Sequence, residues 1–320
     1  MQSFLASWRL YGRTDRVSRN IFGVLAVLLP LLLWSAVSYL PFVWHPQVLI
    51  TDPGGEDYLE VGMRMNRADF TRAVKEMAAQ HQPVPQGIAS NPVYLPSPGE
   101  VLSAFVHAFT SSAPVGAEHS ITQAFAHSLR IIFWGFVISS LMGVPLGILC
   151  GSVPAFARLV EPSVDFFRYL PAPAFGALAV AILGIYDAPK IAIIVIGTLF
   201  QQILVIANTT RQLDFALVEA SRTLGAKGLR LLFRVVIPGI LPDLYKDQRI
   251  LLGWAWTYLI VAELIGTSSG ITWFITQQAR YQHVDNVFAA MALIGIVGLG
   301  TDMVLGAVGR KLFAWKRENG

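Results

Sequence analysis

The chain has 320 residues, of which 54% are hydrophobic and only 14% are charged, and its mean hydropathy is +0.55. Soluble domains carry about a quarter charged residues, so the composition excludes an ordinary soluble protein and indicates a membrane protein. The formal net charge of +4 then fits arginine and lysine residues that set membrane topology rather than nucleic-acid binding.

Six apolar runs are long enough to cross a bilayer as helices, because about 20 apolar residues span its hydrocarbon core. The first run follows several arginines, and no small-residue cleavage site follows it, so a retained helix is expected instead of a signal peptide. Arginine and lysine concentrate at both ends of the chain and in every second connection, which predicts cytoplasmic termini. The predicted spans are residues 21–43, 121–151, 159–185, 190–208, 250–266 and 287–308.

Residues 44–120 are therefore expected outside the membrane, as an unusually long polar connection after the first span. Between its turn-rich ends, Asn66 is the predicted cap of an amphipathic helix that has Asp69 at its third position. A second helix is predicted where Ser97 stands at the cap, a proline at the first position and Glu100 at the third. The external segment is thus expected to consist of short amphipathic helices.

The second and third predicted spans contain glycine and proline patterns with different implications. Gly143, Gly147 and Gly151 recur every fourth residue, a spacing that allows close packing of two helices. Tyr169 and Phe175 lie beside two prolines, which free backbone groups where a helix lines a cavity. These two aromatic side chains are candidates for lining a solute pathway, and ordinary helix packing is the alternative.

The connection between the fourth and fifth spans is the most distinctive part of the sequence. Asp214 is the predicted cap of a short helix over residues 215–224, and Gly225 stands where that helix would end in a left-handed conformation. A second helix over residues 227–236 is expected to be interrupted by Pro238. The pattern favours either a helical hairpin whose arginines meet lipid headgroups or a docking element for a soluble partner.

This segment resembles the EAA loop of ABC importer permeases. Glu219, Ala220 and Ser221 stand for its Glu-Ala-Ala, with serine in place of the second alanine. Gly225 follows at the position of its glycine, and Pro238 ends a VVIP that corresponds to its Ile-x-Leu-Pro. The resemblance implies a coupling helix that contacts an ATP-binding subunit. In that arrangement Glu219 is a charged contact or a cap, and Gly225 sets the angle between the two helices. The residues that it assigns to coupling are Asp214, Glu219, Ala220, Ser221, Gly225 and Pro238.

Longer stretches are similar to the nitrate/sulfonate/taurine-type subgroup of these permeases. They include YLPSPGEVLSAF, SLRIIFWGFVISSLMGVPLGILCG, VAELIGTSSGI and GIVGLGTDMVLGAVGR, and the similarity covers about residues 93–317. It implies the MetI-like type I permease fold in the bacterial inner membrane and a small anion, such as nitrate, a sulfonate or taurine, as the substrate. Residues 44–92 have no obvious counterpart, which predicts an extra external insert after the first helix.

The resemblance also implies the partners and the division of the chain. Two permease copies, two ATP-binding cassette subunits and an external solute-binding protein are expected, with membrane lipid around them. ATP and magnesium are expected in the ATPase subunits and no cofactor in this chain, which has no G-x-x-x-x-G-K-[ST] loop and is not expected to be an enzyme. The predicted parts are residues 1–43 (N-terminus and first helix), 44–120 (external segment) and 121–320 (five-helix core with the coupling loop 209–249).

Charged side chains inside predicted spans are costly, so they mark either structural pairs or a polar pathway. Arg130, Arg168 and Glu263 are candidates for the pathway, in which arginines would supply a positive field for an anion. Alternatively, Glu263 or Asp302 pairs with Arg130 or Arg168 between helices or accepts hydrogen bonds from serines. A different reading is an ion-coupled secondary transporter that uses Glu263 and Asp302. No catalytic cluster or metal-ligand spacing favours a membrane enzyme or an assembly factor.

Overall fold

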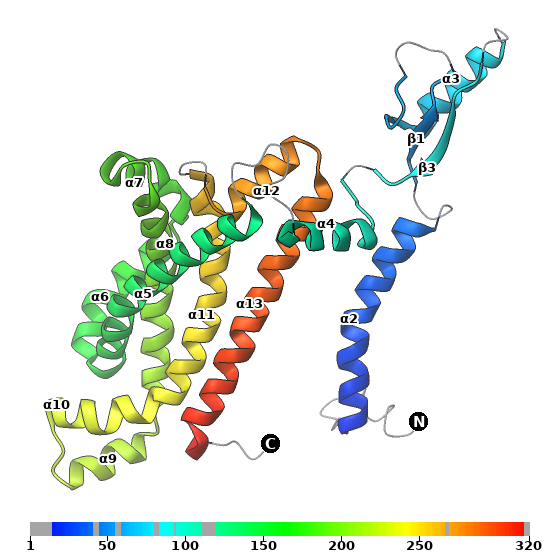
Figure 1. The fold of residues 1–320 in the computed structure, drawn as a ribbon. Helices are drawn as coiled ribbons and strands as arrows, with labels where there is room; N and C mark the ends of the chain where they lie inside the picture. The colour runs from blue at the N-terminus through cyan, green and yellow to red at the C-terminus, as the bar shows by residue number, and fades with distance from the viewer. Residues whose placement is uncertain are drawn as a thin grey trace. The chain divides into compact units, whose positions relative to one another are not determined.

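The structure is a computed structural model of the chain (Figure 1), and helices make up most of it, as the composition predicts. The chain divides into two compact units, one of residues Met1–Ser111 with Gln278–Ala289 and the other of Ser112–Gln277 with Ala290–Gly320. The N-terminal arginines Arg9 and Arg13, used to predict topology, lie outside the described residues. The described residues are 15–40, 45–54, 59–79, 83–92, 94–110, 120–265 and 269–316.

The first unit contains a small sheet that the sequence analysis did not predict. Its strands are antiparallel in the order β2-β1-β3, and Val48 and Ile50 on β1 point inward, where they are buried with Ala73 and Met77 of a helix. The strands are additional to the short amphipathic helices predicted in this segment, and strands this short carry little alternation in the sequence. The elements are α2 (Arg16–Tyr39), β1 (Gln47–Asp52), β2 (Arg64–Asn66), α3 (Arg67–Ala79), β3 (Gln86–Ser90) and α4 (Pro98–Thr110).

The two helices predicted in this segment are present and begin where their caps were expected. α3 starts directly after Asn66. At the start of α4, the Glu100 backbone N–H donates to Ser97 Oγ (3.3 Å) and the Ser97 N–H donates to Glu100 Oε2 (2.7 Å). This reciprocal pair is the predicted capping box, which satisfies two backbone donors that the helix itself leaves unpaired.

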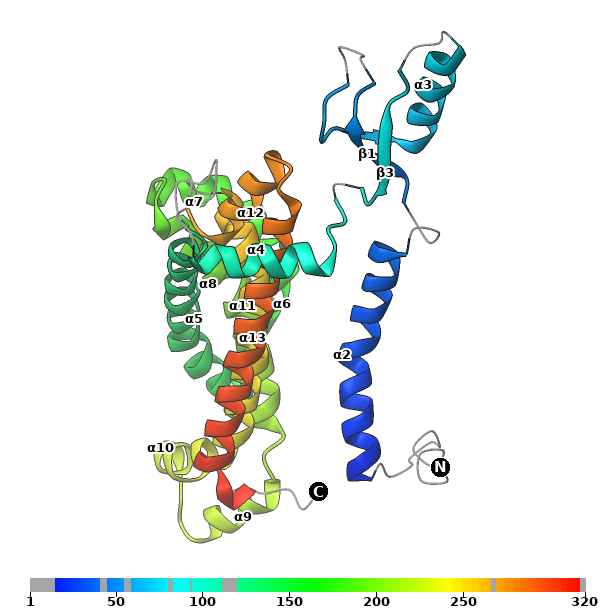
Figure 2. The same ribbon diagram turned by 45° about the vertical axis from the view of Figure 1, so that its right-hand side comes forward.

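The second unit is a helical bundle in which α5, α8 and α11 lie side by side (Figures 1 and 2). The short helices α9 and α10 lie at one end of this unit, together with the C-terminal end of α13, and α7 lies at the other end (Figures 1 and 2). The remaining elements are α5 (Ile121–Ser152), α6 (Pro154–Arg168), η1 (Ala172–Phe175), α7 (Gly176–Leu183), α8 (Asp187–Arg211), α9 (Phe215–Thr223), α10 (Gly228–Leu231), η2 (Leu232–Val236), α11 (Ile237–Ile265), α12 (Ile271–Arg280), α13 (Val284–Leu312) and η3 (Ala314–Lys316). The end of α12 and the start of α13 belong to the first unit.

Four helices of the described chain are long and apolar enough to cross a membrane, namely α2, α5, α8 and α13. They correspond to the first, second, fourth and sixth predicted spans. The fifth predicted span lies in the second half of α11, where Arg249 and Glu263 lower the hydropathy, and its crossing stays a prediction.

The third predicted span, residues 159–185, is not one continuous helix. α6 ends at Arg168, and the following pair η1–α7 is bent from it by 87°. Pro171 and Pro173 explain the break, because proline lacks an N–H and disfavours helical geometry in the residue before it. The two segments together form either a broken span or a re-entrant loop.

Glycines on α5 bring α5 and α8 into close contact. A Cβ on Gly143 would lie 2.8 Å from Gln202 Oε1, and one on Gly147 would lie 2.7 Å from Ile206 Cβ. A Cβ on Gly151 would likewise lie very close to Thr210 of α8. The prediction that these glycines serve close helix packing is therefore confirmed.

We expect the substitution Gly147→Ala to destabilise the bundle by about 1–3 kcal/mol, the usual cost of overpacking a tight interface. The added Cβ would also meet the backbone oxygen of Ile203 at 2.8 Å, which cannot move as a flexible side chain would. Thermal unfolding in detergent measures the effect. The control is Gly253→Ala on α11, whose Cβ would meet no atom within 4 Å, and an equal loss in both variants would contradict the packing argument.

Candidate functional site

The short helix α9 begins at the predicted cap. Asp214 Oδ1 accepts a hydrogen bond from the Ala216 N–H (2.9 Å), which satisfies one of the free donors of the first turn. Within the helix, Ser221 Oγ donates to the Leu217 carbonyl (2.8 Å). Both bonds are local, so the helix is specified by its own sequence.

Gly225 ends α9 in a left-handed conformation, as predicted, with φ of +89°. Its N–H donates to the Arg222 carbonyl (2.9 Å), and the Ala226 N–H donates to the Ser221 carbonyl (3.0 Å). This pair of bonds is a Schellman motif, which needs a residue with positive φ at the glycine position. A Cβ at Gly225 would meet no atom within 4 Å, so the glycine is required for its backbone conformation and not for space.

The chain beyond Gly225 differs from the prediction at Pro238. A helix over 227–236 that stops at the proline was expected, but α10 passes into the π-helical turn η2, and α11 continues through Pro238. The Ile237 N–H donates to the Leu232 carbonyl five residues back. This wider turn precedes Pro238, which sits in the first turn of α11, where a missing N–H costs little. The second helix of the hairpin is thereby continuous with the bundle.

The short helix α9 exposes apolar side chains. None of its residues is buried, and Phe215 and Leu217 are 62% and 45% exposed. Glu219 and Ala220 are exposed as well, and Leu224 just after the helix is 88% exposed. Behind the helix, a cavity of about 610 Å³ separates the hairpin from the adjoining ends of α5 and α8. An apolar helix that the unit itself does not cover is typical of a docking element.

Three contacts tie the base of this hairpin to the bundle. Thr209 Oγ1 donates to Asp247 Oδ2 between α8 and α11, and Arg211 at the end of α8 pairs with Glu161 of α6. Leu213 packs against Gly239 at the start of α11. These contacts join α6, α8 and α11 next to the start of α9.

The candidate pathway residues of the third predicted span lie around its break. Tyr169 caps the end of α6 and is 76% exposed, and Phe175 is half-buried in η1. The Arg168 guanidinium pairs with Asp165 (3.0 Å) and lies 4.8 Å from the centre of the Tyr169 ring. Arg130 on α5 is exposed. The structure thus groups Arg168 with Tyr169 and does not bring Arg130 into an ion pair among the described residues.

Glu263 is 1% exposed and caps the start of α12. One carboxylate oxygen accepts a hydrogen bond from Ser128 Oγ, and the other accepts one from the Thr272 N–H (2.8 Å). Ser128 Oγ in turn accepts the Ile271 N–H (2.8 Å). Gly270 has φ of +101° and lies against the carboxylate, where no side chain would fit. The structural alternative, in which serine donates to Glu263, is therefore the arrangement seen.

Asp302 also has a structural partner. Its two oxygens accept hydrogen bonds from Arg249 Nε (3.1 Å) and from a terminal nitrogen of the same guanidinium (2.9 Å). The sequence analysis paired it with Arg130 or Arg168 instead, and the structure corrects that partner. Both carboxylates that an ion-coupled transporter would use are engaged in holding helices together.

The sequence analysis missed a buried polar cluster next to Glu263. The Lys190 side chain is 0% exposed, and its ammonium donates to Ser269 Oγ (2.7 Å) and lies 3.8 Å from Asp187 Oδ1. His127 Nε2 lies 3.0 Å from the same carboxylate. In the sequence, Lys190 stands at the edge of an apolar run. That position is equally typical of a lysine at the membrane interface.

Comparison with known proteins identifies the family. The family described as "binding-protein-dependent transport system inner membrane component" matches residues 143–313, a stretch that includes the α9 hairpin and its connection to α11. The chain belongs to this family. It is accordingly a permease subunit of an ABC importer and a component of the inner membrane.

Individual permeases of the family agree with this assignment. A probable ABC transporter permease protein of Brucella abortus is 34% identical over 230 residues, which are 72% of this chain and 89% of the relative. The taurine transport system permease protein TauC of Escherichia coli is 28% identical over 229 residues, 71% of this chain and 82% of that protein. A bacterial alginate ABC transporter, solved in complex with a periplasmic protein, has a TM-score of 0.53 at 14% identity and covers 93% of this chain and 98% of its own. It shares the fold.

Proposed function

We propose that this ABC importer permease is coupled to ATP hydrolysis through α9, which docks exposed apolar side chains into a groove on an ATP-binding subunit. The observation that carries the proposal is that α9 buries none of its residues although Phe215 and Leu217 are apolar. A groove that accepts such a helix buries apolar area at each anchor position and so holds the helix tightly. Glu219 and Arg222 are exposed on the same helix and add charged contacts.

The hairpin is built to transmit a push from such a partner. The contacts at its base connect it to α8 and α11, which extend along the bundle, and η2 runs into α11 without a break. Packed helices move as rigid bodies between discrete arrangements. Closure of the ATPase dimer would therefore rock these helices between inward-open and outward-open states, and Gly225 would fix the angle at which α9 meets α10.

ATP and magnesium belong to the partner subunits in this proposal, and this permease subunit has no ATPase activity of its own. The family description as binding-protein-dependent supports an external solute-binding protein as a further partner. Two permease copies complete the complex. The helix α2 is apolar, and only 6% of its most apolar stretch is buried, which leaves its sides for lipid or a second copy.

The end of the second unit that carries α9 faces the cytoplasm in this proposal, with both termini on that side. The supporting observation is the charge of this end, since cytoplasmic connections in membrane proteins carry an excess of arginine and lysine. The hairpin and its flanks supply Arg211, Arg222, Lys227, Arg230 and Arg234.

The proposed substrate is a small anion. A taurine permease is among the relatives, and the break in the third predicted span holds Arg168 beside the exposed Tyr169. A guanidinium in a partly dry pathway attracts an oxyanion and can bind it through two parallel hydrogen bonds. Tyr169, Phe175, Arg168 and Arg130 are the residues proposed to line the pathway, and Glu263 is assigned to structure instead.

The experiment that tests coupling is purification of the permease from its native membrane in mild detergent, with identification of the proteins that accompany it. We expect an ATP-binding subunit in stoichiometric amount. The substitution Leu217→Asp should lower its recovery by about tenfold or more, because a charge buried in an apolar groove is strongly unfavourable.

The matched control is Leu229→Asp on α10, which changes an equally apolar residue that is 71% exposed in the same hairpin. It should leave recovery of the ATP-binding subunit near the wild-type level. Equal recovery with Leu217→Asp and with the wild type would rule out docking through the exposed apolar side chains of α9.

A further inference from the structure

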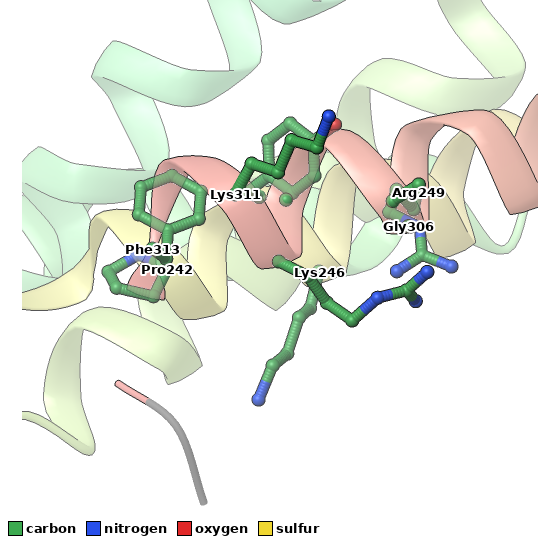
Figure 3. Close-up of a pocket in the computed structure, with 10 residues that line it drawn as sticks. Pro242, Lys246, Arg249, Gly306, Lys311 and Phe313 are labelled. Atoms are coloured by element: carbon green, nitrogen blue, oxygen red, sulfur yellow. The ribbon is translucent and has the colours of Figure 1, made fainter. Parts of the chain in front are cut away.

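A cavity of about 560 Å³ lies between the first half of α11 and the end of α13, at the same end of the second unit as α9 (Figure 3). Figure 3 places Pro242 and Phe313 at one end of the cavity and Arg249 with Gly306 at the other, with Lys246 and Lys311 between them. Two helices that are not consecutive in the chain thus supply one lining.

One wall of this cavity is aromatic and held in place. The rings of Tyr245 and Phe313 lie 5.5 Å apart between centres, and Tyr245 Oη donates to the Leu305 carbonyl (2.8 Å). Gly309 lies against the Tyr245 ring, where a Cβ would stand 2.7 Å from a ring carbon. The absent side chain lets α13 approach the tyrosine, so the wall is a feature of the helix packing.

The opposite part of the lining is cationic and is also held. Asp302 fixes the Arg249 guanidinium through two hydrogen bonds, and Gly306 leaves room for it, since a Cβ there would lie 2.9 Å from a guanidinium nitrogen. A guanidinium anchored on one edge keeps its remaining donors in a fixed direction.

The charges around the cavity do not balance. Besides Tyr245, every ionisable side chain in the lining is a cation, namely Lys246, Arg249, Arg310 and Lys311. Asp302 neutralises one of them, and Asp243 lies 3.7 Å from Lys246. Within the described ranges no carboxylate forms an ion pair with Arg310 or Lys311. Like charges gathered at one cavity repel each other, and a bound anion offsets that repulsion.

Membrane topology explains why cations stand at this end, and the helix dipole of α13 favours Arg310 and Lys311 in its last turn. Neither effect accounts for a cavity whose aromatic wall and anchored arginine converge with those cations.

We propose that this cavity is a binding site for a phosphate group, which takes hydrogen bonds from Arg310 and Lys311 while its apolar substituent lies against Tyr245 and Phe313. The inference rests on α11 and α13 alone and does not depend on docking through α9.

Phosphate fits this lining because arginine forms two parallel hydrogen bonds to its oxygens and lysine adds a point charge. An anionic phospholipid headgroup and a soluble phosphate share this chemistry. The experiment uses the full chain in a neutral detergent and follows its thermal unfolding midpoint during titration with phosphatidylglycerol or with inorganic phosphate. Neutral phosphatidylcholine is the reference for each titration.

We expect an anion-specific rise of the unfolding midpoint, and we expect the double substitution R310Q/K311Q to weaken the apparent affinity by about tenfold or more. Binding of phosphatidylglycerol alone assigns the site to a lipid headgroup, whereas binding of inorganic phosphate assigns it to a soluble anion. The charge-preserving exchange R310K/K311R should retain binding, because both positive charges remain at the cavity.

The control R158Q/R234Q removes two exposed arginines from α6 and η2 and gives the same net charge as the test variant. It should bind the anion as the wild type does. The proposal is overturned if the wild type responds no more to either anion than to phosphatidylcholine. It is overturned equally if R310Q/K311Q keeps the wild-type affinity, or if the control loses as much affinity as the test variant.

Discussion

Replacing Gly225 by proline should abolish coupled transport, with a fall of about tenfold or more in solute-stimulated ATPase activity of the assembled importer. Proline fixes φ near −65°, whereas this position has φ of +89°. It also removes the N–H that donates to the Arg222 carbonyl. The helix α9 would lose its exit, and its exposed side chains would no longer meet the partner at the required angle.

Gly225→Asn is the variant that separates conformation from folding. Asparagine adopts positive φ more readily than other side chains, and no atom lies within 4 Å of the added Cβ. Its ATPase activity should stay within about threefold of wild type. Reconstitution with the ATP-binding subunits and a binding protein gives the readout, and full stimulation in Gly225→Pro would refute a coupling role for this turn.

The substitution Glu263→Ala should destabilise the second unit by about 3 kcal/mol or more, because removing one partner of a buried charged network leaves the others unsatisfied. The Thr272 N–H would lose its acceptor, Ser128 Oγ would keep only the Ala124 carbonyl, and the buried Lys190 would lose the nearby negative charge. The unfolding midpoint in detergent should fall by about 10 °C. Glu263→Gln keeps an acceptor for the Thr272 N–H. Its unfolding midpoint should therefore lie between those of the wild type and Glu263→Ala.

Asp302→Asn is the matched carboxylate control. Its side chain is 52% exposed in the pair with Arg249, and exposed pairs contribute about 0–1 kcal/mol. The midpoint of this variant should therefore change little. If Glu263→Ala kept its stability but lost transport in an ion-dependent way, the carboxylate would serve ion coupling and its assignment as the cap of α12 would be wrong.

Features fixed by neighbouring residues could be read from the sequence. Three features depend on hydrogen bonds within one turn of chain, so their residue types predict them. They are the capping box of Ser97 and Glu100, the cap at Asp214 and the left-handed turn at Gly225. The glycine repeat at Gly147 is likewise a matter of spacing. The apolar runs at α2, α5, α8 and α13 could be recognised for the same reason, since length and hydropathy are local properties.

Partners across the fold could not be read in this way. The sequence could not pair Asp302 with Arg249 or place Ser128 on Glu263, because residues far apart in the chain meet only when the helices pack. The same holds for Lys190, whose partner Ser269 lies far along the chain. The two prolines near Phe175 predict an interruption of the helix but not the 87° bend. The size of the bend depends on what the segment after the interruption packs against.

The sequence by itself therefore determined that this is a membrane permease with a helical hairpin between two of its spans, because hydropathy, caps and the EAA pattern are all encoded locally. Only the tertiary structure decided which charges are structural. It assigned Glu263 to a helix cap and Asp302 to an arginine, and it gathered the cations of α11 and α13 around one cavity. A charge's role depends on its neighbours and its distance from water, and packing alone sets both.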